Sequence, residues 1–166
     1  NGTSFNLNTS AILEGTHTYK VYGNDTVGTM GTSSVRTITL DTTVPAVTLT
    51  NPSNGTNRST GTLAFNATIK ETVIDSVRFS FSNATGTAFN ITPTNVSGNW
   101  NTNVDPAILA EGTQTMTVLA NDTVSNYNRT ETISFTIDRT APVVTIIGPA
   151  ASRNFSIASS NQTFNV

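Results

Sequence analysis

The sequence predicts an all-β fold built from packed antiparallel sheets. Three observations support this prediction: a composition rich in Thr, Ser and Asn, an alternation of apolar and polar residues, and an internal repeat. Only 11% of the 166 residues are charged, and the dominant residue types combine β-branched stiffness with turn chemistry. Because these residues have little helix propensity, helices are not expected to form the core.

The alternation has a period of two residues, which places successive side chains on opposite faces of a half-buried strand. Turn signals such as Asn54-Gly55, Ser97-Gly98 and Asn121-Asp122 separate these short runs. Trp100 is expected to fill the core between the strands. The other expected inward positions are Val47, Leu49, Leu63, Phe65, Ala67, Ile69, Val77, Phe79, Phe81, Met116, Val118, Ala120, Ile133, Phe135 and Ile137.

The internal repeat appears when the segment from Glu14 is aligned with the segment from Glu111, at an offset of 111 − 14 = 97. At this offset Asn24-Asp25-Thr26-Val27 meets Asn121-Asp122-Thr123-Val124, and Asp41 and Pro45 meet Asp138 and Pro142. A period near 97 residues matches an immunoglobulin-type sandwich of ~100 residues. The sequence therefore predicts tandem immunoglobulin-like antiparallel β-sandwiches.

The repeat divides the chain at its two Asp-to-Pro junctions. Residues 1–41 are expected to be the C-terminal part of one repeat, 42–138 a complete repeat, and 139–166 the N-terminal part of the next. The two partial repeats cannot bury their inner faces alone, so further repeats or neighbouring chains should complete them. A strand such as residues 143–147 could be donated to a neighbouring sheet edge, although truncation explains the same ends.

The segment Glu111-Gly112-Thr113-Gln114-Thr115-Met116-Thr117-Val118-Leu119-Ala120-Asn121-Asp122, followed by an Asp-x-Thr-x-Pro junction, resembles the Ig-like repeats of bacterial and archaeal surface proteins. The resemblance implies extracellular spacers, adhesins or surface-layer parts. In that family a Gly-Asn pair typically follows the Asn-Asp hairpin. This sequence has Gly28-Thr29 in one copy and Ser125-Asn126 in the other, so neither copy keeps the whole Gly-Asn pair.

Acceptor motifs for N-linked glycans, Asn-x-Ser/Thr with x other than proline, are unusually dense. Roughly five or six would arise by chance from this composition, whereas thirteen are present. An alternative is that Asn, Ser and Thr serve only as turn and edge residues. The dense motifs on repeats of prokaryotic type suggest an archaeal surface. The predicted glycosylation sites are Asn1, Asn8, Asn24, Asn54, Asn57, Asn66, Asn83, Asn90, Asn95, Asn121, Asn128, Asn154 and Asn161.

Several functional classes find no support in the sequence. The chain has no cysteine, so it holds neither disulfides nor thiolate metal sites. A net charge of −2 gives no attraction for nucleic acid or anionic lipid, and no apolar run is long enough for membrane insertion. The single histidine, His17, is matched by Gln114 in the next copy, so it is interpreted as an outward surface residue and not as a general base. No catalytic residues are assigned, and the chain is not expected to be an enzyme.

Apart from glycans, calcium is the only candidate cofactor that the sequence suggests. Asp41 and Asp138 stand at the junctions, near the hairpin residues Asp25 and Asp122, with Glu14 or Glu111 nearby. A calcium site needs six to eight oxygen ligands, and only one or two carboxylates per junction are available. The aspartates are better explained as turn and capping residues, and no metal is assigned.

Three functions are compatible with these features. The favoured one is a structural component of a heavily N-glycosylated extracellular array, in a filament, pilus-like polymer or surface layer, with copies of itself or neighbouring repeats as partners. The second is an adhesin stalk or ligand-binding module, for which Tyr22, Tyr127 and Phe155 are the candidate exposed contacts, whereas Phe5 is expected in the core. The third is an accessory domain of a secreted enzyme.

Overall fold

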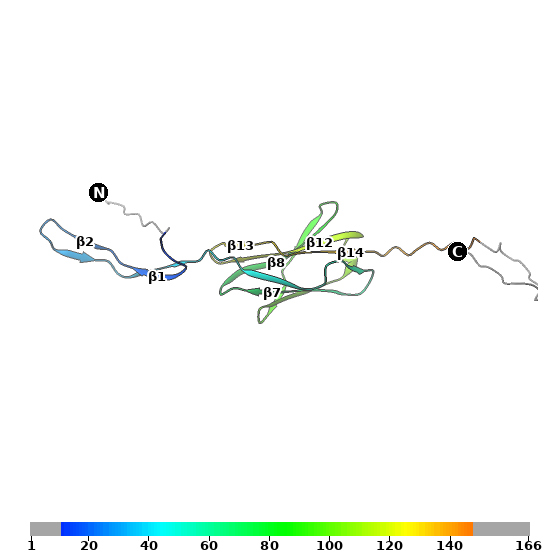
Figure 1. The fold of residues 1–166 in the computed structure, drawn as a ribbon, viewed down its shortest axis with the longest axis horizontal. Helices are drawn as coiled ribbons and strands as arrows, with labels where there is room; N and C mark the ends of the chain where they lie inside the picture. The colour runs from blue at the N-terminus through cyan, green and yellow to red at the C-terminus, as the bar shows by residue number, and fades with distance from the viewer. Residues whose placement is uncertain (1–10, 148–166) are drawn as a thin grey trace, which may run out of the picture.

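The structure is a computed structural model in which residues 11–147 are described. It is elongated, with a β-hairpin at one end, a sandwich in the middle and an extended segment leaving from the other end (Figure 1). The hairpin contains β1 (Gly15–Tyr19), β2 (Tyr22–Asn24), β3 (Met30–Thr32) and β4 (Arg36–Leu40). The sandwich contains β5 (Ala46–Asn51), β6 (Thr56–Arg58), β7 (Leu63–Lys70), β8 (Ile74–Asn83), β9 (Ala88–Ile91), β10 (Thr94–Val96), β11 (Asn99–Val104), β12 (Gly112–Asp122), β13 (Tyr127–Asn128) and β14 (Thr132–Ile137).

The sandwich consists of two sheets whose strand orders are those of an immunoglobulin fold. One sheet has the order β10-β11-β7-β5, and the other has the order β6-β14-β12-β8-β9, with β13 also paired to β12. All pairings are antiparallel except β6 with β14. Residues 46–58 supply a strand to each sheet in turn, as the first strand of many immunoglobulin domains does. The predicted all-β immunoglobulin-like sandwich is confirmed.

The period of two in the sequence is seen as alternate burial along the strands. In β7 every second residue from Leu63 to Ile69 is buried, and β12 shows the same alternation from Gln114 to Asp122. The apolar inward positions predicted in β7, β8, β12 and β14 are all buried, while Val47 and Leu49 are partly buried and pack against the core. Among the described residues the only helical segment is a 3-10 turn, η1 (Pro106–Ile108), so no helix there could cross a membrane.

Three phenylalanine rings join the two sheets at the centre of the sandwich. Phe65 of β7 makes edge-to-face contacts with Phe81 of β8, at 4.9 Å between ring centroids, and with Phe135 of β14, at 5.3 Å. All three side chains are at most 1% exposed. Since β7 lies in one sheet and β8 and β14 in the other, these contacts hold the sheets face to face.

Trp100 does not fill the core as predicted. Its side chain points inward from β11 but is only half-buried, and it packs against the core from the side. The physical reason is its position next to the edge strand β10, where it lines an open cleft between the sheets together with Ile69 and Ile74.

The hairpin at the N-terminal end repeats the last strands of the sandwich. β1 pairs with β4 so that Gly15 faces Leu40, and β12 pairs with β14 so that Gly112 faces Ile137, which is the same register 97 residues later. The departure from the Gly-Asn pattern does not alter the turn, because the main-chain bond from Gly28 to Asp25 recurs from Ser125 to Asp122. The division into residues 1–41, 42–138 and 139–166 stays a prediction.

His17, which is expected as an outward surface residue, lies on the face of β1 that corresponds to the core-facing row of β12. It is half-buried and lies at the place of Gln114, which is 3% exposed in the core-facing row of β12. His17 Nε2 lies 2.7 Å from the Leu13 carbonyl oxygen, and Gln114 Nε2 donates to the Ala110 carbonyl oxygen at 2.9 Å. Both side chains therefore make the same contact four residues back along the chain, and each closes the loop before its strand.

Candidate functional site

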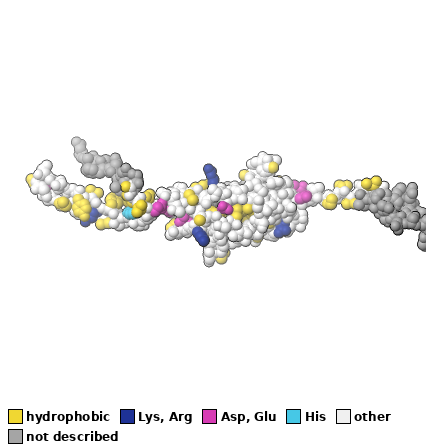
Figure 2. Space-filling view, in the orientation of Figure 1, with side chains coloured by type: hydrophobic (Ala, Val, Ile, Leu, Met, Phe, Trp, Pro, Cys, Tyr) yellow, Lys and Arg dark blue, Asp and Glu magenta, His cyan; other side chains and the backbone are white. Residues whose placement is uncertain are grey.

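The features that bear on function are the surface asparagines of the sandwich and the junction between the hairpin and the sandwich. Figure 2 shows that charged side chains are few and scattered over the visible face, while apolar ones gather on the hairpin and the C-terminal extended segment. Exposed apolar residues of these two regions include Val21, Val35, Val143 and Ile147. The visible surface of the sandwich is instead dominated by uncharged polar groups.

Nine of the predicted acceptor asparagines lie within the described residues, and all of them are exposed or half-buried. Three occupy edge strands: Asn57 in β6, Asn90 in β9 and Asn95 in β10. Asn66 lies on the outward face of the central strand β7, as predicted from its place between Phe65 and Ala67. The remaining described ones are Asn24, Asn54, Asn83, Asn121 and Asn128, whereas Asn1, Asn8, Asn154 and Asn161 lie outside the described residues, as do Phe5 and Phe155.

Several of these asparagines use only the amide oxygen. Asn83 Oδ1 accepts hydrogen bonds from Thr85 N at 3.1 Å and Thr87 N at 2.9 Å, which closes the turn between β8 and β9. Asn54 Oδ1 accepts from Ser134 N at 2.8 Å, and Asn95 Oδ1 accepts from Gly98 N at 3.0 Å. These bonds fix the side chain while leaving Nδ2, the atom that carries an N-linked glycan, without a protein partner among the described residues.

Two other asparagines use the nitrogen instead. Asn128 Nδ2 donates to the carbonyl oxygen of the buried Pro45 at 2.8 Å. Asn121 Nδ2 donates to Asp75 Oδ2 at 3.2 Å, and its Oδ1 accepts from Ser76 Oγ. Both asparagines are half-buried. Their amides therefore serve the structure of the sandwich, in contrast to the amides of the preceding group.

The junction between the hairpin and the sandwich is held by side chains of the sandwich. Asn126 Nδ2 donates to the Asp41 carbonyl oxygen at 3.0 Å, and the bond from Asn128 to Pro45 lies four residues farther along the junction. The corresponding residues of the hairpin, 97 positions earlier, are Thr29 and Gly31, which have no side-chain amide. These two contacts were not predicted, although the alignment of the repeats marks both positions as different.

Within each repeat the start of the following junction is fixed by a glutamate. Glu14 Oε1 accepts a hydrogen bond from Thr42 N at 2.9 Å, and Glu111 Oε1 accepts from Arg139 N at 2.8 Å. Arg139 adds bonds that Thr42 cannot make, because its guanidinium donates to the carbonyl oxygens of Pro106 at 2.8 Å and Leu109 at 3.2 Å. The sequence did not single out Arg139, and only its mismatch with Thr42 in the repeat alignment signals it.

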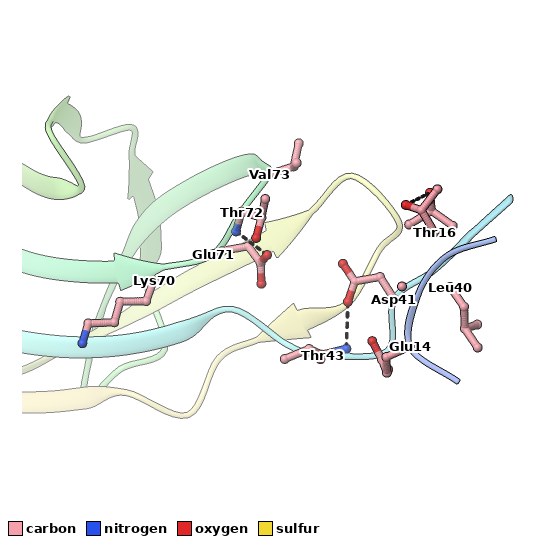
Figure 3. Close-up of a pocket in the computed structure, with 11 residues that line it drawn as sticks. Glu14, Thr16, Leu40, Asp41, Thr43, Lys70, Glu71, Thr72 and Val73 are labelled. Carbon is pink, nitrogen blue, oxygen red and sulfur yellow. Dashed lines mark hydrogen bonds between the residues drawn. The ribbon is translucent and has the colours of Figure 1, made fainter. Parts of the chain in front are cut away.

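The junction also borders a cleft between the hairpin and the turn that connects β7 to β8. Figure 3 shows Glu14 and Asp41 on one side and Glu71 and Thr72 on the other. Each carboxylate already accepts a hydrogen bond from its own neighbourhood: Asp41 from Thr43 N, and Glu71 from Thr72 N. No group of three or more His, Cys, Asp or Glu side chains within residues 11–147 is arranged to hold a metal ion.

Asp25 of the hairpin and Asp122 of the sandwich cap turns, as predicted from the sequence. Asp25 Oδ1 accepts from Val27 N and Thr29 N, and Asp122 Oδ1 accepts from Val124 N and Asn126 N, all within 3.0 Å. The backbone bond from Thr29 is the largest influence on Asp25, and its pKa is lowered. Burial raises the pKa of Asp122, but the hydrogen bonds from Asn126, Val124 and Ser125 together outweigh burial and lower it.

The two tyrosines predicted as exposed contacts, Tyr22 and Tyr127, do not share a common binding platform. Tyr22 is 59% exposed and Tyr127 is 47% exposed, as predicted for candidate contacts. They lie on separate elements, β2 of the hairpin and β13 of the sandwich. Tyr22 lies beneath the ammonium group of Lys20, whose Nζ is 5.0 Å from the ring centroid.

The strand order and the core define an immunoglobulin-like sandwich, and comparison with known proteins names the type. Residues 98–162 match the family model of the bacterial Ig-like domain (group 3). The match runs across the Asp138–Pro142 junction. The predicted resemblance to the Ig-like repeats of bacterial and archaeal surface proteins is confirmed.

Among known proteins, the chain is similar to halomucin of Haloquadratum walsbyi, with 32% identity over 109 residues. The similarity covers 66% of this chain but only 1% of halomucin. Among solved structures, an endo-β-1,4-mannanase from Thermotoga petrophila aligns with 60% of this chain and 21% of its own, at 11% identity and a TM-score of 0.49. An engineered protein aligns with 57% of this chain and 20% of its own, at 17% identity and a TM-score of 0.47.

Proposed function

We propose that the chain is a stiff, non-catalytic segment of a tandem Ig-like array, exposed on an archaeal cell surface and coated with N-linked glycans. The observation that carries this proposal is the position of three acceptor asparagines on edge strands of the sheets. Of the four edge strands, β6, β9 and β10 each contain one, and β5 contains none. A glycan on an edge strand blocks the pairing of its free backbone groups with another chain.

The composition of the sandwich surface supports the same function. With 11% charged residues and a net charge of −2, electrostatic repulsion contributes little to solubility. Bulky, hydrated glycans would supply the separation between molecules that charge does not. The chain has no cysteine and therefore no disulfide crosslink to stabilise it. Glycans that shield the edges would also protect transiently opened strands against proteolysis.

The hydrogen bonds of the Nδ2 atoms distinguish the acceptor asparagines that can carry a glycan from those that have a structural role. Glycan attachment replaces a hydrogen on Nδ2, so an asparagine whose Nδ2 has no protein partner accepts a glycan without loss of a contact. We therefore assign glycans within the sandwich to Asn54, Asn57, Asn66, Asn83, Asn90 and Asn95. Asn121 and Asn128 are assigned a structural role, because a glycan there would displace the bonds to Asp75 and Pro45.

The stiffness of the array follows from the junction contacts. Asn126 and Asn128 each bond to the main chain of the segment from Asp41 to Pro45. The buried proline ring fixes its own φ, so few free torsions remain between the hairpin and the sandwich. A string of such domains would behave as a rod, which suits a filament or surface layer better than a flexible tether.

The proposal is tested by electron cryomicroscopy of the native array together with mass spectrometry of its glycopeptides. We expect rod-shaped particles with a repeat of one domain, and additional density at Asn57, Asn90 and Asn95. Flexible, bead-like chains with bare asparagines would contradict both the stiffness and the glycan coat. Rods with bare asparagines would remove only the glycan coat from the proposal.

A further inference from the structure

The lateral cleft beside Trp100 has the composition of a carbohydrate site. Its lining combines the apolar side chains of Ile69, Ile74 and Trp100 with the polar groups of Glu71, Thr72 and Asp75. The cleft has a volume of about 400 Å³, which lies within the range of sites that hold small molecules. A lining that combines an aromatic ring with carboxylates and a hydroxyl suits a sugar, whose ring has apolar faces and whose hydroxyl groups donate hydrogen bonds.

Asn95 brings a predicted glycan acceptor to the wall of this cleft. It lies on β10 directly opposite Trp100 of β11, and both residues line the cleft. Directly opposed residues of antiparallel strands have Cβ atoms about 5 Å apart on the same face of the sheet. A sugar attached to Asn95 is therefore tethered within reach of the indole ring.

The turn after Asn95 fixes the direction of its amide. Ser97 and Gly98 both have positive φ, 52° and 83°, as in the two-residue hairpin turns that match strand twist. Gly98 N donates to Asn95 Oδ1 at 3.0 Å, so the oxygen is held by the turn and Nδ2 is left to carry the glycan. The neighbouring Val96 is 59% exposed, which leaves this edge of the sandwich open to solvent.

We propose that the glycan on Asn95 folds back over Trp100 and closes the open edge between the two sheets. This inference rests on the proposed function, because it requires that the sandwich is glycosylated. The first sugar would cover the exposed part of the indole ring. The carboxylates of Glu71 and Asp75 would accept hydrogen bonds from its hydroxyl groups. The glycan would then be part of the packed structure as well as a surface coat.

Trp100 is the single tryptophan of the chain, so its fluorescence reports on this cleft alone. We would compare the glycosylated protein with Ser97→Gly made in the same glycosylating host. This variant removes the acceptor motif but keeps Asn95 and suits the positive φ at position 97. In Ser97→Gly we expect red-shifted emission and a roughly twofold increase in acrylamide quenching, because the indole ring becomes exposed.

Asn90→Gln is the matched control, because it removes a motif from the other sheet and should leave Trp100 fluorescence unchanged. Equal quenching in the parent and in Ser97→Gly, with Asn95 glycosylated in the parent, overturns the inference. Glycopeptides that show a bare Asn95 beside occupied Asn57 and Asn90 also overturn it, while the proposed function stands. Bare asparagines throughout contradict both.

Discussion

The side-chain amide of Asn126 donates to the main-chain carbonyl oxygen of Asp41, 3.0 Å away and 85 residues earlier in the sequence. The same amide also donates to Asp122 Oδ2 at 2.8 Å, so it ties the turn after β12 to the preceding junction. In the hairpin the corresponding residue is Thr29, which cannot make these bonds. The orientation of the hairpin on the sandwich therefore depends on a residue that differs between the aligned segments.

Replacement of Asn126 by threonine should loosen this junction. We expect the free energy of unfolding to fall by about 1 kcal/mol, the usual contribution of such hydrogen bonds. Spin labels at the exposed residues Thr18 and Thr48 should then show a broader distance distribution by pulsed electron paramagnetic resonance. Asn103→Thr is the control, because Asn103 is exposed on β11 away from the junction. Unchanged distance distributions in both variants would show that Asn126 does not set the orientation.

Removal of the Asn128 side chain should destabilise even the unglycosylated protein. Its Nδ2 donates to Pro45 O at 2.8 Å, and its Oδ1 accepts from Thr130 N and Thr130 Oγ1 at 2.9 Å. We expect Asn128→Ala to lower the free energy of unfolding by about 1–3 kcal/mol, since the carbonyl oxygen of the buried Pro45 loses its partner.

Asn57→Ala is the comparison for Asn128, because Asn57 is exposed on an edge strand, and it should change stability by less than about 0.5 kcal/mol. Chemical denaturation of protein from a non-glycosylating host measures both variants. If the two variants were equally stable, Asn128 would lose its assigned structural role.

The aromatic contacts between the sheets predict the most sensitive core position. Phe65 is 0% exposed and touches both Phe81 and Phe135 across the sandwich. Phe65→Ala should cost about 3–5 kcal/mol, because it leaves a cavity between the sheets. Phe89→Ala is the control: Phe89 stacks on Phe81 at 5.1 Å but is 36% exposed, so its loss should cost clearly less. Equal losses in urea denaturation would contradict this central role for Phe65.

The core could be predicted from the sequence because its side chains follow a strict local rule. The alternation along β7, β8, β12 and β14 gives the buried face directly, and the repeat supplies the length of the domain. The alternation did not predict the partial exposure of Trp100, because the burial of this side chain depends on the strand order. A residue next to an edge strand has less sheet opposite it than one in a central strand, and sequence does not show which strand is the edge.

His17 and Gln114 show that residue type alone does not determine which face of a strand a side chain occupies. The register places His17 in the row of β1 that corresponds to the core-facing row of β12. Its match with Gln114 is the basis both for the predicted surface position and for the argument against catalysis. The same match also indicates that both side chains bond to the carbonyl group four residues back. The junction contacts of Asn126 and Asn128 could not be predicted, because they join residues more than 80 positions apart.

The turn after β12 offers a stabilising substitution. Ser125 has φ of 74°, whereas the equivalent positions of two turns with the same hydrogen bonds are Gly28, at 87°, and Gly86, at 82°. A side chain in this conformation costs roughly 1–2 kcal/mol, which glycine avoids. Ser125→Gly should therefore raise the thermal midpoint. Ser134→Gly, on β14 with ordinary strand geometry, should lower it. A lower midpoint for Ser125→Gly would mean that the serine side chain stabilises the turn.

Asp122 should make the stability of the sandwich depend on pH in acid. Its pKa in the folded protein lies below the ordinary value of 3.8, because hydrogen bonds to the charged form outweigh its burial. The stabilisation is therefore fully present above pH 3.8 and is lost as the pH falls through the lower pKa of the folded state. Asp122→Asn should flatten this part of the profile of thermal midpoint against pH.

Asn83 shows that a neutral amide can close the same turn, since its Oδ1 accepts from the main-chain N–H groups two and four residues ahead, as Asp122 Oδ1 does. Asp122→Asn should consequently fold, and the reciprocal Asn83→Asp should steepen the acid dependence, because a carboxylate then accepts the same bonds. Thermal midpoints of the parent and both variants, measured between about pH 2 and 6, around the usual carboxyl pKa, test these two expectations. Parallel profiles for the parent and Asp122→Asn would place the acid sensitivity at other carboxylates.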